Sequence, residues 1–261
     1  MAKKFLGQHF LSDPRILRRI ADALPAKPGD LVLEIGPGRG ALTAVLVAKG
    51  FRVTAIERDR DLVAGLIARF PEVTIVSGDA LTLDWPATLG VAAGTGWFLI
   101  GNIPYNITSP LIDQALTGPR PEAIVFLVQR EVSLRLVALP NTSEYGALTV
   151  GVASSAKVER LFNVPAGAFQ PPPKVESSVV RITPGGGGQP PGFRRLVVGL
   201  FGGRRKQLGR ALRTVLGLGQ AEAADLVVRA VLDPTQRPET LTVAEFERLY
   251  RVVVDAGIGK G

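Results

Sequence analysis

Short apolar runs alternate with longer segments of mixed polarity through the first two thirds of the chain. The runs have the length and the Val, Ile and Leu content of buried strands. They occupy residues 31–35, 51–56, 73–76, 97–100 and 123–128. Helices are expected between them, beginning at Ala41, at Asp59 and near Ser109. This alternation predicts an α/β fold, a Rossmann-like parallel sheet with helices on both faces.

Two later segments, 147–155 and 176–182, also have the apolar pattern of strands, and they predict a hairpin at an antiparallel edge. A stretch rich in Gly and Pro follows at 184–192 and predicts a flexible linker. Beyond it the spacing is helical, at 193–201, 204–216, 221–231 and 243–253. We therefore expect an α/β domain over residues 1–183 and a small all-helical domain over residues 193–261.

The composition excludes several classes of protein and of metal site. Hydrophobic residues make up 46% of the 261 positions and charged residues 21%, which is typical of a globular protein with a sizeable core. No apolar run approaches the roughly 20 residues that cross a bilayer, and no signal peptide follows the basic N-terminus. The lack of cysteine excludes thiolate metal sites, and the single histidine, His9, excludes a His-rich one. We expect a cytoplasmic protein without a bound metal.

A glycine loop, Gly36-Pro37-Gly38-Arg39-Gly40, joins the first predicted strand to a helix. This context suits a nucleotide, because glycines let backbone N–H groups approach a ligand beside a helix N-terminus. Glu57 ends the second predicted strand, where it can accept both hydroxyls of a ribose. Asp79 and Ala80 follow the third, and Asp79 is a candidate acceptor for an adenine amine. Because dehydrogenases, flavoproteins and methyltransferases all use glycine loops followed by an acid, the loop and Glu57 leave these classes open.

The residues after the fourth run carry more specific chemistry. Asn102, Ile103, Pro104 and Tyr105 lie at the expected carboxyl end of a strand, where ligands bind in open α/β sheets. The Asn102 side chain and the Ile103 carbonyl offer acceptors for an exocyclic amine. Pro104 stiffens the turn, and Tyr105 offers a flat face for stacking. Acceptors that bind the amine hydrogens out of the ring plane direct the nitrogen lone pair toward a methyl donor, so the motif favours amine methylation over hydride transfer.

Two further features suit an RNA substrate. Phe169, ahead of a stiff Pro run, is a candidate to stack on a base held against Tyr105, although a buried Phe beside a polyproline loop explains the pattern as well. The net charge is +8, with 12 Lys and Arg against 7 Asp and Glu beyond residue 184, which suits a polyanionic partner. The candidate RNA contacts are Lys3, Lys4, Lys174, Arg204, Arg205, Lys206 and Arg210. A solvated charged surface is the alternative for these cations.

Taken in order, the motifs resemble those of the ribosomal RNA adenine dimethyltransferases. The matching segments are 7–11, 34–40, Glu57, 78–80, 102–110, 129–132, 145–146 and 169–175. Pro110 and the segment 201–206 resemble the small-subunit branch of the family more than the macrolide-resistance branch, which acts on large-subunit RNA.

The resemblance implies that S-adenosylmethionine is the cofactor and that the targets are two adjacent adenosines near the 3′ end of small-subunit (16S) ribosomal RNA, methylated at N6. It implies cofactor contacts from His9, Leu11, Gly36, Glu57, Asp79 and Asn102, and a grip on the target base from Asn102, Tyr105 and Phe169. His9 departs from the family pattern, in which Asn is commoner. We expect a monomer acting within a pre-30S particle. The alternatives are a large-subunit methyltransferase, an assembly factor that methylates only secondarily, and a nicotinamide oxidoreductase.

Overall fold

The computed structural model describes residues 9–92, 94–104, 107–185 and 190–258. The chain divides into two compact units, of which the first contains residues 1–133 and 157–185 and the second contains residues 134–156 and 186–261. This division differs from the expected one in a single internal segment. Residues 134–156 pack with the C-terminal helices, and they do so through Tyr145 and Val150, which belong to the same buried cluster as Phe246.

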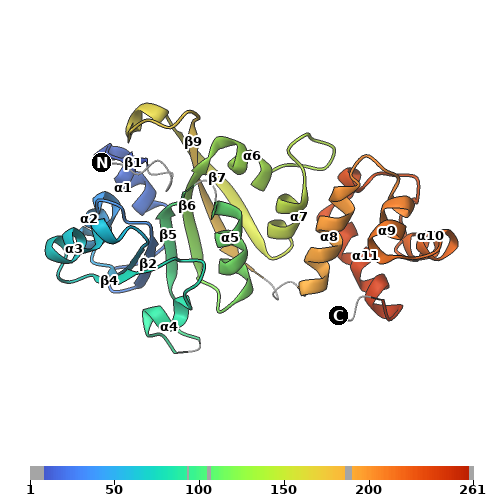
Figure 1. The fold of residues 1–261 in the computed structure, drawn as a ribbon, viewed down its shortest axis with the longest axis horizontal. Helices are drawn as coiled ribbons and strands as arrows, with labels where there is room; N and C mark the ends of the chain where they lie inside the picture. The colour runs from blue at the N-terminus through green and yellow to red at the C-terminus, as the bar shows by residue number, and fades with distance from the viewer. Residues whose placement is uncertain (1–8, 93, 105–106, 186–189, 259–261) are drawn as a thin grey trace. The chain divides into compact units, whose positions relative to one another are not determined.

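The first unit is built on a sheet that has seven strands within the described residues (Figure 1). These are β2 (Leu31–Ile35), β3 (Arg52–Glu57), β4 (Thr74–Ser77), β5 (Phe98–Asn102), β6 (Ala123–Gln129), β7 (Ala156–Val164) and β9 (Ser177–Pro184). Their order across the sheet is β4-β3-β2-β5-β6-β9-β7. Strands β2 to β6 pair in parallel, and β9 is antiparallel to β6. The mostly parallel sheet with an antiparallel edge is therefore confirmed.

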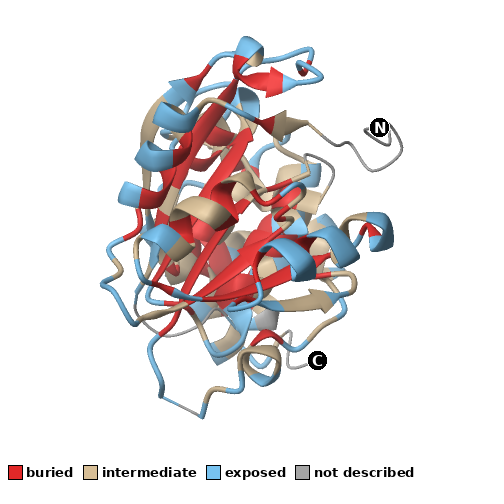
Figure 2. Cartoon of the chain, turned by 90° about the vertical axis from the view of Figure 1, so that its left-hand side faces the viewer, coloured by how far each residue is buried: buried red, intermediate tan, exposed pale blue. Residues whose placement is uncertain are grey.

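Helices cover both faces of this sheet. They are α1 (Pro14–Asp22), α2 (Ala41–Ala48), α3 (Arg60–Arg69), α4 (Trp85–Leu89), α5 (Thr108–Thr117) and α6 (Arg130–Leu136), the last of which crosses the boundary between the units. Val32 and Phe98 belong to one buried cluster with Leu46 of α2, whereas Leu33, one position along β2, is buried outside it. Successive strand residues point to opposite faces, so both faces are buried, and Figure 2 shows the strands as a band of buried residues.

The carboxyl ends of the parallel strands meet at one edge of the sheet. Ile35 pairs with both Ile56 and Gly101, and Glu57 pairs with Ser77. The strand order reverses between β2 and β5, since β3 and β4 extend the sheet on one side and β6 on the other. A Cβ on Gly101 would lie 2.5 Å from the Ile35 carbonyl oxygen, so only glycine allows this close approach. Such a reversal leaves a crevice outside the strand ends, where ligands bind.

Two short strands pair outside the main sheet. β1 (Phe10–Leu11) runs antiparallel to β8 (Phe169–Gln170), with Leu11 opposite Phe169. The 3₁₀ turn η3 (Ala166–Ala168) leads into β8. This pairing joins the N-terminal segment to a loop about 160 residues later in the chain.

The second unit is helical. It contains α7 (Ala147–Ala153), α8 (Pro191–Gly202), α9 (Leu208–Leu216), α10 (Gln220–Arg229), the 3₁₀ turn η4 (Pro238–Thr240) and α11 (Val243–Asp255). The Tyr145 hydroxyl donates to the Leu241 carbonyl at 2.7 Å. Thr242 caps α11, because its hydroxyl accepts from the Glu245 N–H while the Glu245 carboxylate accepts from the Thr242 N–H. The four helices expected beyond the linker are confirmed, with α9 starting four residues late.

One secondary-structure prediction is wrong. Residues 147–155 were expected to form a strand, and residues 147–153 form α7 instead. Thr149 and Val150 are buried against the helical core, and the Gly146 N–H donates to the Thr149 hydroxyl at 3.1 Å at the start of the helix. Tertiary packing thus overrides the β propensity of the Val and Thr residues. None of the helices in the described part of the chain has both the length and the apolar character of a membrane span.

Candidate functional site

A cavity of about 340 Å³ opens at the carboxyl ends of β2, β3 and β5. It falls in the size range of ligand sites in proteins. Ten of the residues singled out in the sequence line it: His9, Leu11, Gly36, Gly38, Glu57, Asp79, Ala80, Asn102, Ile103 and Pro104. Residues separated by up to 95 positions in the sequence therefore meet in one place. Eight of them follow or end strands at the same edge of the sheet, and His9 and Leu11 come from the N-terminal segment that pairs with β8.

Glu57 lies in the wall of this cavity, at the end of β3, and is 6% exposed. One carboxylate oxygen accepts from the Gly38 N–H at 2.9 Å, and the other accepts from the Asp59 N–H at 2.7 Å. Burial raises the pKa of Glu57, the two N–H donors oppose that rise, and the neighbouring Asp59 charge adds to it. Each oxygen has a further lone pair, so the carboxylate is held rigidly and still offers acceptors to a pair of hydroxyls.

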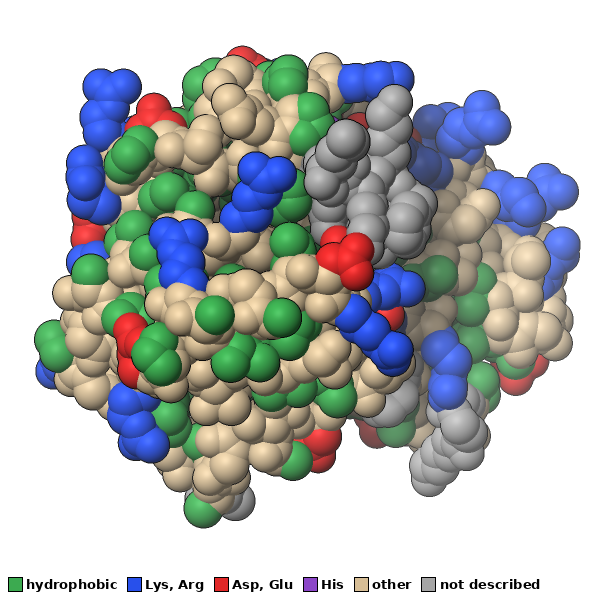
Figure 3. Space-filling model, turned by 60° about the vertical axis from the view of Figure 1, so that its left-hand side comes forward, with side chains coloured by type: hydrophobic (Ala, Val, Ile, Leu, Met, Phe, Trp, Pro, Cys, Tyr) green, Lys and Arg blue, Asp and Glu red, His purple; other side chains and the backbone are tan. Residues whose placement is uncertain are grey.

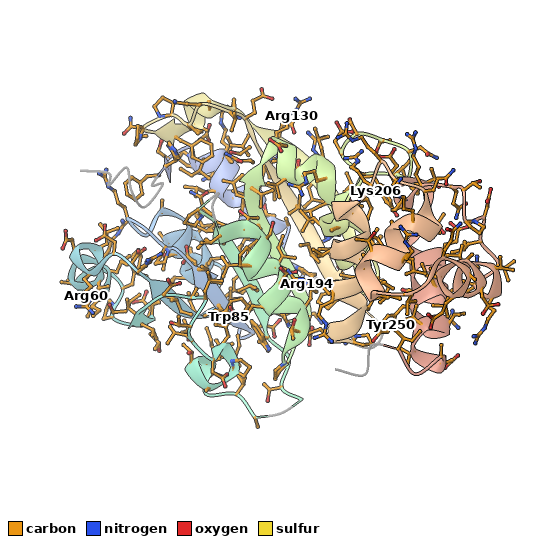
Figure 4. The ribbon with its side chains drawn as sticks, turned by 45° about the vertical axis from the view of Figure 1, so that its right-hand side comes forward. Arg60, Trp85, Arg130, Arg194, Lys206 and Tyr250 are labelled. Atoms are coloured by element: carbon orange, nitrogen blue, oxygen red, sulfur yellow. The ribbon has the colours of Figure 1, made fainter. Side chains whose placement is uncertain are left out.

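Asp79 follows β4 and is anchored in a similar way. Its carboxylate accepts from the Leu81 N–H at 3.0 Å, and it lies 3.4 Å from the Arg58 guanidinium. The Ala80 carbonyl accepts from the indole N–H of the buried Trp85, which is labelled in Figure 4. The loop after β4 is therefore fixed, with the Asp79 carboxylate at the cavity and partly exposed.

Asn102 ends β5, and its side chain reaches the N-terminal segment. Its amide nitrogen donates to the His9 carbonyl at 2.9 Å. Ile103 buries its side chain and donates its N–H to the Leu127 carbonyl, while the Pro104 carbonyl accepts from the Ile107 N–H. These bonds hold the turn against β6, and Asn102 stays at the cavity wall. Tyr105, Lys3 and Lys4 lie outside the described residues.

Of the two interpretations given for Phe169, the structure agrees with a buried side chain and not with one placed at the cavity to stack on a base. Phe169 is 3% exposed, belongs to the main core cluster and is absent from the cavity wall. The reason is the β1–β8 pairing: successive residues alternate in direction, so Phe169 points into the core while Gln170 lines the cavity. Lys174, farther along this loop, is exposed as a phosphate contact requires.

Several residues of the cavity wall were not among the predicted site residues. Phe10, Arg39, Arg58 and Gln170 line it, and so does Glu34, an acid within the apolar strand β2. An isolated acid in a buried strand was the available signal for Glu34, since charged groups are almost never fully buried without a partner. Arg39 belongs to the glycine loop, and Phe10 and Gln170 lie in the segments 7–11 and 169–175 that match the family, whereas Arg58 showed no such signal.

Glu34 is 1% exposed, and its carboxylate accepts from the Thr43 hydroxyl at 2.7 Å. Burial raises its pKa to about 7; the Thr43 hydrogen bond opposes this and the Glu57 charge adds to it. As the pH rises, the folded protein therefore keeps the Glu34 proton up to a higher pH than the unfolded chain, in which this carboxyl has its ordinary pKa of 4.5. The stability from this proton is fully present below pH 4.5 and is lost as the pH rises through 7.

We therefore expect Glu34→Gln, which cannot ionise, to remove this pH dependence. Between pH 4.5 and pH 8 the free energy of unfolding of the unsubstituted protein should fall by about 3 kcal/mol relative to that of the variant. Denaturant unfolding of both proteins across this range measures the difference. Parallel pH profiles for the two proteins would show that Glu34 titrates normally.

The candidate RNA contacts of the second unit fall into two groups. Arg205 and Lys206 are exposed at the turn between α8 and α9, where Lys206 is labelled in Figure 4, and Arg210 is exposed in the first turn of α9. Arg204 is instead engaged within the unit: its guanidinium donates to Glu239 at 2.8 Å and reaches the Ser143 carbonyl at 3.5 Å. Figure 3 shows Lys and Arg side chains spread over the visible surface with fewer acids among them.

Two N–H groups at the start of α9 are not open to a phosphate. The Leu208 N–H donates to the Gln236 carbonyl at 2.7 Å, and the Gly209 N–H donates to the Pro234 carbonyl at 3.0 Å. These are two of the N–H groups that a helix N-terminus would otherwise present to an anion. Any phosphate contact at this turn therefore depends on the cationic side chains.

Comparison with known proteins places these features in a family context. A family model described as "Ribosomal RNA adenine dimethylase" matches residues 1–251. The "Ribosomal RNA small subunit methyltransferase A" of Aromatoleum aromaticum is 44% identical over 253 residues, which cover 94% of this chain and 91% of that protein. The protein of the same description from Pseudomonas aeruginosa is 41% identical over 262 residues, covering 95% and 93%.

Two solved structures are similar over nearly the whole chain. A dimethyladenosine transferase from Plasmodium falciparum has a TM-score of 0.83 and 26% identity, covering 96% of this chain and 99% of that one. The 23S rRNA methyltransferase ErmE has a TM-score of 0.69 and 25% identity, covering 94% and 99%. The likeness therefore extends over both units.

Proposed function

Since the chain belongs to the ribosomal RNA adenine dimethylase family, we propose that it transfers methyl groups from S-adenosylmethionine to N6 of two adjacent adenosines near the 3′ end of small-subunit ribosomal RNA. The observation that carries the proposal is the meeting of Glu57, Asp79 and Asn102 around one cavity. The names of the relatives at 41% and 44% identity favour the small-subunit branch over the large-subunit one.

The residues at the cavity fit the proposed cofactor. Glu57 keeps acceptors for ribose hydroxyls, Asp79 offers one for an adenine amine, and Gly36 and Gly38 line the cavity beside them. S-adenosylmethionine, when bound, supplies an activated methyl group on a sulfonium. The chain contributes position and electrostatics, which supply most of the rate in such a reaction.

Asn102 provides the acceptor for the target amine. Its oxygen binds a hydrogen of N6, so the nitrogen lone pair is directed away from the adenine ring. S-adenosylmethionine, held by Glu57 and Asp79, would supply the methyl group to this nitrogen and would keep the electron pair of its C–S bond on sulfur. The proton of the alkylated nitrogen, now acidic, leaves to water, so no strong base is required. His9 and Leu11 of the N-terminal segment close the cavity beside this residue.

The direct test uses ribosomal RNA from a strain that lacks the enzyme. Purified protein and S-adenosylmethionine are incubated with small subunits, pre-30S particles, naked small-subunit RNA and large-subunit RNA, and nucleosides are analysed by mass spectrometry. We expect N6-dimethyladenosine in small-subunit RNA only. Methylation of large-subunit RNA alone would support the macrolide-resistance type instead, and binding of NADH without methylation would support an oxidoreductase.

The second unit is proposed to bind the RNA through the exposed cations at the turn between α8 and α9, Arg205 and Lys206. Because Arg205 and Lys206 are exposed, we expect Arg205→Gln and Lys206→Gln each to lower the salt slope of RNA binding by about 1. Each should leave the free energy of unfolding within about 0.5 kcal/mol.

Arg204→Gln is the matched control, because the Arg204 side chain is 41% exposed and its guanidinium is bound to Glu239. We expect Arg204→Gln to lower the free energy of unfolding by about 1 kcal/mol, a value that allows for the solvent exposure of the pair. Its change in the salt slope of RNA binding should be smaller than that of Arg205→Gln or Lys206→Gln. Equal salt slopes for all three variants would contradict this division. Filter binding at several salt concentrations and thermal unfolding supply the measurements.

All residues of the cavity wall belong to the first unit of a single chain. This supports the proposal that a monomer acts on the RNA within a pre-30S particle. An assembly role is separable from methylation with Glu57→Ala, because loss of cofactor binding in the first unit should leave RNA binding through Arg205 and Lys206 intact.

A further inference from the structure

The N-terminal segment His9–Ser12, which we call the strap, is attached to the rest of the first unit at both of its ends. The His9 ring donates from Nδ1 to the Pro171 carbonyl at 2.8 Å, since a carbonyl can only accept. The Ser12 N–H donates to the Ala168 carbonyl at 3.1 Å. Between these two bonds, Phe10 and Leu11 form β1 and pair with β8. The strap is therefore an ordered part of the site rather than a loose leader.

The middle of the strap lies across the glycine loop. A Cβ on Gly38 would lie 3.0 Å from ring carbons of Phe10, and the Arg39 guanidinium lies 4.6 Å from the centre of the same ring. A cation over an aromatic face is attractive, so Arg39 helps to hold Phe10 against the loop. All four strap residues line the cavity. The strap thus forms part of the cavity wall.

The strap also sets the orientation of Asn102. The Asn102 amide nitrogen donates to the His9 carbonyl at 2.9 Å. A carboxamide has an oxygen that only accepts and a nitrogen that only donates. Because the His9 carbonyl can take only the nitrogen, the Asn102 oxygen must point the other way. If the amide turned by 180°, its NH₂ group would face the amine of the target adenine, and two donors would oppose each other.

We propose that His9 is a positioning residue for methyl transfer. Its main-chain carbonyl selects the productive orientation of the Asn102 amide, and its ring keeps that carbonyl in place through Pro171. This inference rests on the proposed function, since it assigns Asn102 the role of amine acceptor. It goes further in making the strap part of the catalytic apparatus as well as a wall of the cofactor cavity.

The kinetic test is a double-mutant cycle of His9→Ala and Asn102→Ala in the full chain. We expect His9→Ala to lower the rate at saturating cofactor by about 10- to 100-fold, as small misplacements of reacting groups do, with the cofactor Kd within about threefold. In the Asn102→Ala background the same change should have no further effect on the rate. Arg15→Gln, on the exposed side chain three residues after the strap, is the control and should be neutral.

Two outcomes would overturn the inference. In the first, His9→Ala weakens cofactor binding and leaves the rate at saturating cofactor unchanged. In the second, the fold-reduction in rate of the double variant equals the product of those of His9→Ala and Asn102→Ala, so the two residues act independently. Methylation of small-subunit RNA by the unsubstituted protein is measured alongside, and its absence would remove the proposed function itself. The two failures are therefore distinguishable.

An NMR measurement keeps the inference testable if Asn102→Ala has no detectable activity. In the cofactor-free protein, one side-chain amide hydrogen of Asn102 should be protected from exchange with solvent by its bond to His9. His9→Ala should reduce that protection at least tenfold, and Arg15→Gln should leave it unchanged. Equal protection in the His9→Ala variant would show that the ring does not hold the carbonyl, and would contradict the proposal.

Discussion

Glu57→Ala is expected to raise the Kd for S-adenosylmethionine by about 10²- to 10⁴-fold. The carboxylate is held by Gly38 and Asp59 with acceptors left for two ribose hydroxyls. A hydrogen bond to a charged group contributes about 1.5–3 kcal/mol, so the loss of two corresponds to about 3–6 kcal/mol. Little of this binding free energy is lost in ordering the carboxylate, because it is already fixed in the free protein. Isothermal titration of the purified variant measures the loss.

The same substitution leaves two backbone donors without their acceptor, so its effect on folding must be separated. Thermal unfolding without cofactor provides that control. Glu57→Gln keeps one acceptor oxygen and nearly the same volume, and we expect a Kd between those of the Ala variant and the unsubstituted protein. A folded Glu57→Ala protein that binds within tenfold of the unsubstituted affinity would show that Glu57 does not contact the ribose.

The positions of Gly36, Glu57, Asp79 and Asn102 could be predicted because they depend on chain order alone. Each stands just after a buried apolar run or at its end, and parallel strands place their carboxyl ends at one edge. No knowledge of side-chain packing is needed for that step. The α/β class was predictable for the same reason, since it follows from alternation of strand and helix patterns.

Contacts between distant segments could not be predicted. The bonds from His9 to Pro171 and from Asn102 to the His9 carbonyl depend on β1–β8 pairing, and two-residue strands have no periodicity to read. Arg204 looked like its neighbours in sequence, but only folding brings it to Glu239. The segment 147–155 was mispredicted for the same reason. Its Val residues favour a strand by propensity, but packing against the helical core makes residues 147–153 a helix.

Phe169→Ala is expected to lower the free energy of unfolding by about 3–5 kcal/mol. The ring is 3% exposed and packs in the main core cluster with Leu11, so its removal leaves a cavity as well as losing apolar contact. Phe169→Leu keeps most of the volume and should cost under about 1.5 kcal/mol. Denaturant unfolding of both variants provides the comparison.

The same two variants decide whether Phe169 also stacks on the target base. If its role is confined to the core, the folded Leu variant should methylate at a rate within about threefold of the unsubstituted protein, because Leu fills the same space. Stacking on a base would instead require the aromatic face, which Leu lacks, and the ring would have to leave the core to provide it. A Leu variant that is stable but more than tenfold slower would therefore mean that RNA binding opens the β1–β8 pair and brings the ring into the cavity.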